Sequence, residues 1–200
     1  MPAIALVLSA VFAALGFGWR SWEQPRRTGS TGFRGITGRP GSVEWSAGVR
    51  FVVAMGVAAF APILQLLGFV APLGVLHALW IQAAGAAIAV LGIAATVYAQ
   101  LDMGDSWRIG VDPSETTTLV RSGVFGWVRN PIFSAMMVFG IGIALLTSNL
   151  VAIAGFVLLI ITIELQVRSV EEPYLLAKHG DAYGDYLAGV GRFVPGVGRI

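Results

Sequence analysis

Five long apolar runs constrain what this chain can fold into more than any other feature. The hydrocarbon core of a bilayer is about 30 Å thick, so a helix needs roughly 17–25 mostly apolar residues to cross it. Only 12% of the 200 residues are charged, about half the share of a typical soluble domain. An open sheet cannot satisfy its edge groups in lipid. We therefore predict an all-α integral membrane protein with about five transmembrane helices, over residues 3–19, 49–70, 75–99, 131–147 and 150–167.

The basic residues indicate how these helices are oriented. All 13 Lys and Arg fall within residues 20–50, 108–129 and 168–199, whereas the alternate connections, residues 71–74 and 148–149, carry no charge. Lys and Arg are enriched in the cytoplasmic loops of membrane proteins. An odd number of helices then places the N-terminus outside and the C-terminus in the cytoplasm, and we expect the cell membrane as the location. The net charge of +2 follows from this distribution, and no basic surface with interleaved aromatic residues is left for nucleic acid.

The first apolar run is short enough to compare with a signal peptide. No basic residues precede it, however, and the arginines follow it. We therefore expect the run to be retained as a transmembrane helix. The chain has no cysteine, and its two histidines, His77 and His179, are predicted on opposite faces of the membrane. No metal site is expected.

The chain is predicted to form a single membrane domain, residues 1–200. Residues 1–100 hold three helices and a basic loop, residues 20–47, whose Gly, Arg, Ser and Thr are typical of irregular chain near anionic lipid headgroups. Residues 101–200 hold a polar segment, a helical hairpin and a tail with a cytoplasmic amphipathic helix. The polar segment, residues 101–130, is long for a connection, and its Trp and Phe disfavour disorder, so we expect it to be functional.

Charged residues are predicted on one face at the end of the second helix of the hairpin. Glu164, Arg168 and Glu171 fall within an arc of roughly 60° at 100° per residue, with Glu172 beside them. Glu164 lies about one turn inside the apolar run, so we expect it to face the bundle interior and to pair with Arg168. Pro173 predicts a kink at Glu172. These charges indicate a polar ligand site, although an ion pair within the helix that merely ends the membrane span is the alternative.

The hairpin and its flanks contain an ordered set of residues: Arg129, Asn130, Pro131, Phe133, Glu171, Glu172, Pro173, Gly180, Tyr183 and Tyr186. In order and spacing they resemble the isoprenylcysteine carboxyl methyltransferase family. They are also similar to the related phospholipid methyltransferases, which share an Asn-Pro-x-aromatic and a Glu-Glu-Pro. The resemblance covers about residues 104–195. Asn130 stands where the carboxyl methyltransferases usually have His, and Phe133 where they have Tyr.

The resemblance implies methyl transfer from S-adenosylmethionine to a lipophilic acceptor at the cytoplasmic surface of the membrane. By position, Leu119 and Val120 would line the adenosine side of the cofactor, and Arg129 with Asn130 would face it. Glu172 would lie near the ammonium group of the cofactor. S-adenosylmethionine carries a sulfonium, an ammonium and a carboxylate. Its site should therefore contain carboxylates and an arginine and little water, and the residues named above are of these types.

Arg168 and Glu171 would face the acceptor, which we expect to enter laterally from the lipid bilayer. Methyl transfer depends chiefly on holding the nucleophile and the sulfonium in line. If the acceptor is a carboxylate, Arg168 would orient it. If it is an amine, a thiol or a phenol, Glu171 is the candidate general base. The sequence leaves both acceptor classes open.

Two other functions stay open. Membrane sterol and steroid reductases resemble the same C-terminal helices but bind NADPH. Against a reductase, the polar segment has no additional basic cluster for a second phosphate, and Glu171 and Glu172 would repel one. A non-catalytic scaffold or a small transporter is the third alternative. A transporter should show polar groups near the middle of several helices, where only isolated residues such as Gln65 and Gln82 are found.

Overall fold

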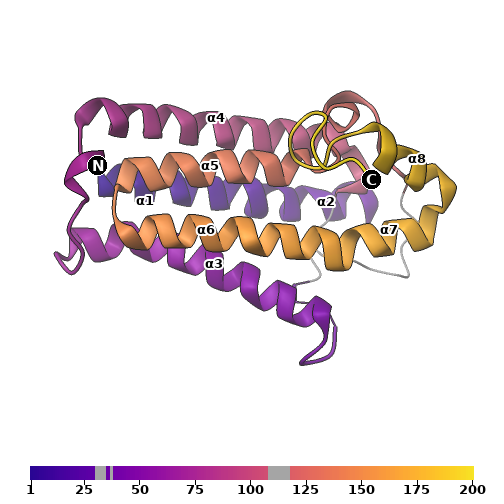
Figure 1. Ribbon diagram of the computed structural model, residues 1–200, viewed down its shortest axis with the longest axis horizontal. Helices are drawn as coiled ribbons and strands as arrows, with labels where there is room; N and C mark the ends of the chain where they lie inside the picture. The colour runs from indigo at the N-terminus through magenta and orange to yellow at the C-terminus, as the bar shows by residue number, and fades with distance from the viewer. Residues whose placement is uncertain (30–34, 37, 108–117) are drawn as a thin grey trace.

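The computed structural model describes residues 1–29, 35–36, 38–107 and 118–200. Long helices lie side by side along the longest axis of the molecule (Figure 1). In chain order the helices are α1 (Pro2–Ala13), α2 (Arg20–Thr28), α3 (Val43–Leu66), α4 (Leu79–Met103), α5 (Pro131–Thr147), α6 (Leu150–Gln166), α7 (Glu172–His179) and α8 (Asp181–Gly189). Within the described ranges there is no β-strand and one isolated parallel bridge, between Val128 and Gly191.

The described residues include four helical stretches that are long and apolar enough to cross a membrane. They are Pro2–Arg26, Val43–Leu66, Leu79–Ser106 and Leu150–His179. The fifth apolar helix is α5, whose 17 residues reach the lower limit for crossing the hydrocarbon core. The predicted all-α membrane fold is confirmed. α7 ends the last of these stretches, and α8 follows it where the sequence predicts a C-terminal helix.

The first helix extends beyond its predicted end. A π-helical segment, Ala14–Trp19, links α1 directly to α2. The prediction of irregular chain over residues 20–47 is therefore wrong at both ends, because helix continues to Thr28 and α3 begins at Val43. Residues 30–34 and 37 of that predicted loop lie outside the described residues.

Contacts with the end of α4 explain why the first helix continues. The Arg20 side chain is fully buried, and its Nη2 donates to the carbonyls of Gln100 (3.2 Å) and Gly104 (2.9 Å). One turn later, Gln24 Nε2 donates to the carbonyl of Trp107 (3.0 Å). The last carbonyls of a helix lack donors within that helix. The first helix therefore satisfies the end of α4 and fixes where the following polar segment starts.

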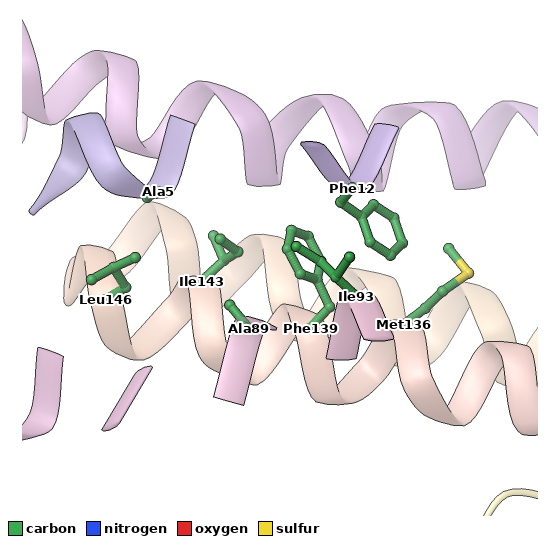
Figure 2. Close-up of a cluster of buried hydrophobic side chains, with 8 residues drawn as sticks. All are labelled: Ala5, Phe12, Ala89, Ile93, Met136, Phe139, Ile143 and Leu146. Atoms are coloured by element: carbon green, nitrogen blue, oxygen red, sulfur yellow. The ribbon is translucent and has the colours of Figure 1, made fainter. Parts of the chain in front are cut away.

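Close packing of α4 against α5 forms the centre of the bundle. A Cβ at Gly92 would lie 2.5 Å from the amide nitrogen of Phe139, and one at Gly142 would lie 2.3 Å from that of Ala89. These distances leave no room for a side chain, so the small residues let the two helices approach closely. Phe12 of α1 stacks on Phe139, with ring centroids 4.2 Å apart. Figure 2 shows the resulting core cluster from α1, α4 and α5: Ala5, Phe12, Ala89, Ile93, Met136, Phe139, Ile143 and Leu146.

The tight turn between α5 and α6 closes one end of the bundle. Ser148 adopts a left-handed conformation (φ 54°), and Asn149 caps α6 by accepting a hydrogen bond from the Ala152 amide (2.8 Å). Asn149 Nδ2 also donates to the carbonyl of Ala61 (3.2 Å) and to Gln65 Oε1 (2.8 Å) on α3. At the opposite end of the molecule, α2, α7, α8 and the C-terminus come together (Figure 1). The charged residues singled out from the sequence lie at that end.

Candidate functional site

Arg129 lies in the turn before α5 and is almost completely buried. Its Nη1 donates to the carbonyls of Leu187 (3.0 Å) and Val190 at the end of α8. Its Nη2 donates to the carbonyl of Gly198 (3.0 Å) and to Glu172 Oε1 (2.9 Å). A cation at a helix C-terminus satisfies orphan carbonyls and complements the helix dipole. Arg129 therefore holds α8 and the end of the chain against the start of α5.

Glu172 lies between two buried arginines. Besides Arg129, it accepts two hydrogen bonds from Arg192, Nε to Oε1 (2.7 Å) and Nη2 to Oε2 (3.0 Å). The side chains of Arg129, Glu172 and Arg192 are 1%, 9% and 6% exposed. The hydrogen bonds from Arg192 to Glu172 raise the pKa of Arg192 above its ordinary value. We call these three residues the buried charge cluster.

The last eleven residues, 190–200, fold back along the start of α5 and form what we call the C-terminal strap. The Arg129 amide donates to the Gly191 carbonyl (2.8 Å), and the Asn130 amide donates to the Arg192 carbonyl (3.1 Å). Ser134 Oγ donates to the carbonyl of Phe193 (2.7 Å). A Cβ at position 191 would lie 2.1 Å from a backbone oxygen of the same strap, so this turn requires glycine.

Two cavities adjoin at the end of the bundle that carries the charges. The large cavity has a volume of about 780 Å³, extends among α1, α3, α4, α5 and α6, and is lined mainly by apolar side chains. Its polar lining at that end includes Asn130, Gln166 and Glu171. The small cavity, about 70 Å³, lies between the segment 118–125 and helices α7 and α8. Five residues line both cavities and form what we call the shared wall: Met103, Phe125, Arg129, Asn130 and Leu175.

The structure brings together most of the residues predicted for the cofactor. Leu119, Val120, Arg129 and Asn130 all line the small cavity. Glu172 is not part of the described lining of either cavity, because both of its oxygens are engaged by the arginines of the buried charge cluster. Residues 108–117 of the predicted functional segment, with its charged Arg108, Asp112 and Glu115, lie outside the described residues.

The two residues predicted for the acceptor are separated. Glu171 lines the large cavity, and Gln166 Nε2 donates to it (3.3 Å). Arg168 is absent from the described lining of both cavities. Its side chain is 58% exposed and its Nε donates to Glu164 Oε2 (2.6 Å). The predicted pair between Glu164 and Arg168 is confirmed as an ion pair within one helix, but the expectation that Glu164 faces the bundle interior is wrong, because its side chain is 36% exposed.

A π-helical segment, Val167–Glu171, explains that separation. Its i→i+5 hydrogen bonds put more residues in each turn than an α-helix has, so Glu171 is rotated away from the face of Arg168. The prediction that Pro173 disrupts helical geometry at Glu172 is wrong, because Glu172 keeps α-helical dihedrals (φ −60°, ψ −46°). The helix continues into α7 with Pro173 in its first turn.

Two buried tyrosines of α8 line the small cavity. Burial raises the pKa of Tyr183 above its ordinary value and raises that of Tyr186 to about 12. The hydroxyl of Tyr186 donates a hydrogen bond to the carbonyl of Phe125 (2.5 Å), in the segment that precedes α5. Both phenols therefore stay protonated at neutral pH, so they act as aromatic walls and hydrogen-bond donors rather than as bases.

Asp102, at the end of α4, shapes the segment that faces α8. Its Oδ2 accepts a hydrogen bond from the Val124 amide (2.8 Å). Gly123 has a positive φ of 57°, and a Cβ there would lie 2.1 Å from the Asp102 carboxylate. This turn presents Phe125 to both cavities.

Sequence reasoning missed Arg20, Gln24 and Arg192. All three are polar residues that the structure buries against distant backbone or charge. One sequence feature could have singled out Arg192: it is the only charged residue in the stretch from Tyr186 to Gly198.

Comparison with known proteins supports the resemblance. A family model described as phospholipid methyltransferase matches residues 80–182. A solved structure, that of the eukaryotic intramembrane Ras methyltransferase isoprenylcysteine carboxyl methyltransferase without a monobody, aligns with a TM-score of 0.56 and 23% identity. The alignment covers 78% of this chain and 51% of the other, so this chain spans about half the length of the solved protein. A search of curated proteins found no match. The resemblance predicted from the sequence is confirmed, and the solved structure shares the helical membrane fold.

Proposed function

The chain belongs to the phospholipid methyltransferase family, and on this premise we propose that it transfers a methyl group from S-adenosylmethionine to a lipophilic acceptor in the large cavity. The observation that carries the proposal is the shared wall. The small cavity, lined by aromatic and aliphatic side chains, and the large apolar cavity meet at Arg129 and Asn130, so a cofactor and a lipid acceptor bound on either side would be neighbours. Holding two reactants in line is the main requirement of methyl transfer.

Two observations support a fit between the cofactor and this end of the bundle. Arg129 brings a positive charge and one donor, Nε, that is buried without a hydrogen-bond partner among the described residues, and both suit a carboxylate. The small cavity is lined by the aromatic rings of Phe125, Tyr183 and Tyr186, which suit a flat base. At about 70 Å³ this cavity is smaller than the roughly 300–1,000 Å³ typical of small-molecule sites, so the cofactor would also occupy the mouth of the large cavity.

We assign residue roles on this basis. Leu119 and Val120 would bound the adenosine side, and Arg129 Nε and Asn130 would face the rest of the cofactor. Glu172 would act through Arg129, a change from direct contact with the ammonium group, because its oxygens are already engaged. The bound cofactor would supply an electrophilic methyl group on a sulfonium.

For the acceptor, Glu171 is the residue best placed to remove a proton from an amine, a thiol or a phenol, since it lines the large cavity. Arg168 would orient a carboxylate acceptor only after its side chain left Glu164 and turned inward. We therefore favour Glu171 as the acceptor-side residue and keep Arg168 as the alternative for a carboxylate.

The orientation proposed from the basic residues agrees with the position of the site. Arg20 begins α2, Arg168 lies just before α7, and Arg192 follows α8. Helices α2, α7 and α8 lie at one end of the bundle (Figure 1), and the turn between α5 and α6 at the other end carries no charge. We propose that this charged end is cytoplasmic, that the N-terminus is outside and that the protein resides in the cell membrane. Since the large cavity extends among membrane-spanning helices, lateral entry of the acceptor from the lipid remains our proposal.

Calorimetric titration of the detergent-purified protein with S-adenosylhomocysteine tests the cofactor assignment, with NADPH titrated in parallel. We expect micromolar binding of S-adenosylhomocysteine and no heat from NADPH. Binding of NADPH alone would instead indicate a reductase. Binding of neither would favour a non-catalytic scaffold or transporter.

A further inference from the structure

We propose that Arg192 is a positioning residue for methyl transfer. Through Glu172 and through its own backbone, it holds Arg129 and Asn130 in the shared wall between the two cavities. This inference rests on the proposed function, because it assigns Arg192 a role in shaping the cofactor side of that wall.

The first step of the argument is the side chain. Arg192 is buried, and its Nε and Nη2 engage both oxygens of Glu172 at 2.7 and 3.0 Å. Two parallel hydrogen bonds fix the carboxylate plane as well as its position. The same Oε1 then accepts from Arg129 Nη2 at 2.9 Å. The orientation of the Arg129 guanidinium therefore depends on a carboxylate that Arg192 orients.

The second step is the backbone of Arg192. Its carbonyl accepts hydrogen bonds from both the amide (3.1 Å) and the side-chain Nδ2 (3.3 Å) of Asn130. Its own amide donates to the Val197 carbonyl (2.8 Å), which folds the strap so that the Gly198 carbonyl reaches Arg129 Nη2 (3.0 Å). Arg192 thus contacts Asn130 directly and Arg129 through Glu172.

The consequence concerns Arg129 Nε. Both Nη atoms of Arg129 are engaged by the chain itself, and only Nε has no partner in the described part of the structure. A guanidinium held at both Nη atoms cannot turn freely, so its Nε keeps a fixed direction. Losing the Arg192 side chain would free Glu172 to shift and would let this donor move.

Three variants test the proposal: Arg192→Gln, Arg192→Lys and, as a control, Arg199→Gln. Arg199 lies on the same strap but is exposed. One readout is the affinity for S-adenosylhomocysteine by calorimetry. The other is amide hydrogen exchange at Arg129 and Asn130 in the ligand-free protein, which reports the strap contacts directly and does not depend on the cofactor.

We expect Arg192→Gln to weaken S-adenosylhomocysteine binding by about 10- to 100-fold, the range for a lost hydrogen bond to a charged group. The Arg129 and Asn130 amides should exchange faster. Arg192→Lys should fall between this variant and the wild type, because lysine keeps the charge but not the two-point contact, and Arg199→Gln should match the wild type.

The outcomes separate this inference from the proposed function. Wild-type affinity and exchange in Arg192→Gln would overturn the positioning role while leaving the methyltransferase assignment intact. If the wild type fails to bind S-adenosylhomocysteine, the proposed function fails and the positioning role fails with it. If Arg192→Gln does not fold, Arg192→Lys carries the test, and wild-type values in that variant on both readouts would overturn the inference.

Discussion

Replacing Glu172 by glutamine should lower the free energy of unfolding by about 3–5 kcal/mol, the range found when one partner of a buried ion pair is removed. Glu172 is 9% exposed and accepts three hydrogen bonds from two arginines that are 1% and 6% exposed. The amide would leave both guanidinium groups buried without a counter-charge, and its own N–H group would point at donors. Thermal or denaturant unfolding in detergent measures the effect.

Glu164→Gln is the matched control for that experiment. Glu164 pairs with Arg168, and both of these side chains are partly solvent-exposed, 36% and 58%, while its distance to Arg192 of the buried charge cluster is a long 4.0 Å. Exposed ion pairs contribute only about 0–1 kcal/mol. Equal losses in the two variants would contradict the buried charge cluster as the element that joins α7, the strap and the start of α5.

The second large effect is expected in turnover. Glu171→Gln should reduce methyl transfer by about 10²- to 10⁴-fold, the usual contribution of a general base. Its affinity for S-adenosylhomocysteine should not change, because we place Glu171 on the acceptor side. The physical reason is that the Glu171 side chain lines the large cavity, whereas Glu164 and Arg168 do not in the described lining.

Glu164→Gln serves again as the comparison and should keep wild-type turnover. Full turnover in Glu171→Gln would remove Glu171 as the base. Such a result would favour a carboxylate acceptor, which has no proton to give up at neutral pH. Arg168→Ala would then be the variant to measure.

The order of the apolar helices could be predicted because hydropathy is a local property of the chain, although α3 begins six residues before its predicted start and α4 ends four residues after its predicted end. The last two helices begin at Pro131 and Leu150 as expected, since Pro favours the first turn of a helix and Asn149 is a good N-cap. The order of the motifs around this hairpin also indicated the family correctly. The helical extension to Thr28 was missed because it depends on partners at the end of α4, some eighty residues away along the chain.

The details of the site could not be predicted, for two physical reasons. Placing Arg168 and Glu171 on one face assumed 100° per residue, and the π-helical segment between them breaks that assumption. The C-terminal strap could not be predicted, because its hydrogen bonds join residues 191–193 to residues 129–134, about sixty positions apart. No local sequence pattern encodes such pairing. Glu172 was expected to contact the cofactor directly, but Arg129 and Arg192 engage both of its oxygens, so we propose support of Arg129 as its role.

The most direct test of the central claim is transfer of a labelled methyl group from S-adenosylmethionine into lipid. Membranes containing the wild-type chain, Glu171→Gln or Glu164→Gln would be incubated with the labelled cofactor and extracted with organic solvent. The account predicts label in an organic-soluble product with the wild type and Glu164→Gln, and little with Glu171→Gln. No label in the organic phase from any of the three, although the wild type binds S-adenosylhomocysteine, would contradict a lipophilic acceptor in the large cavity.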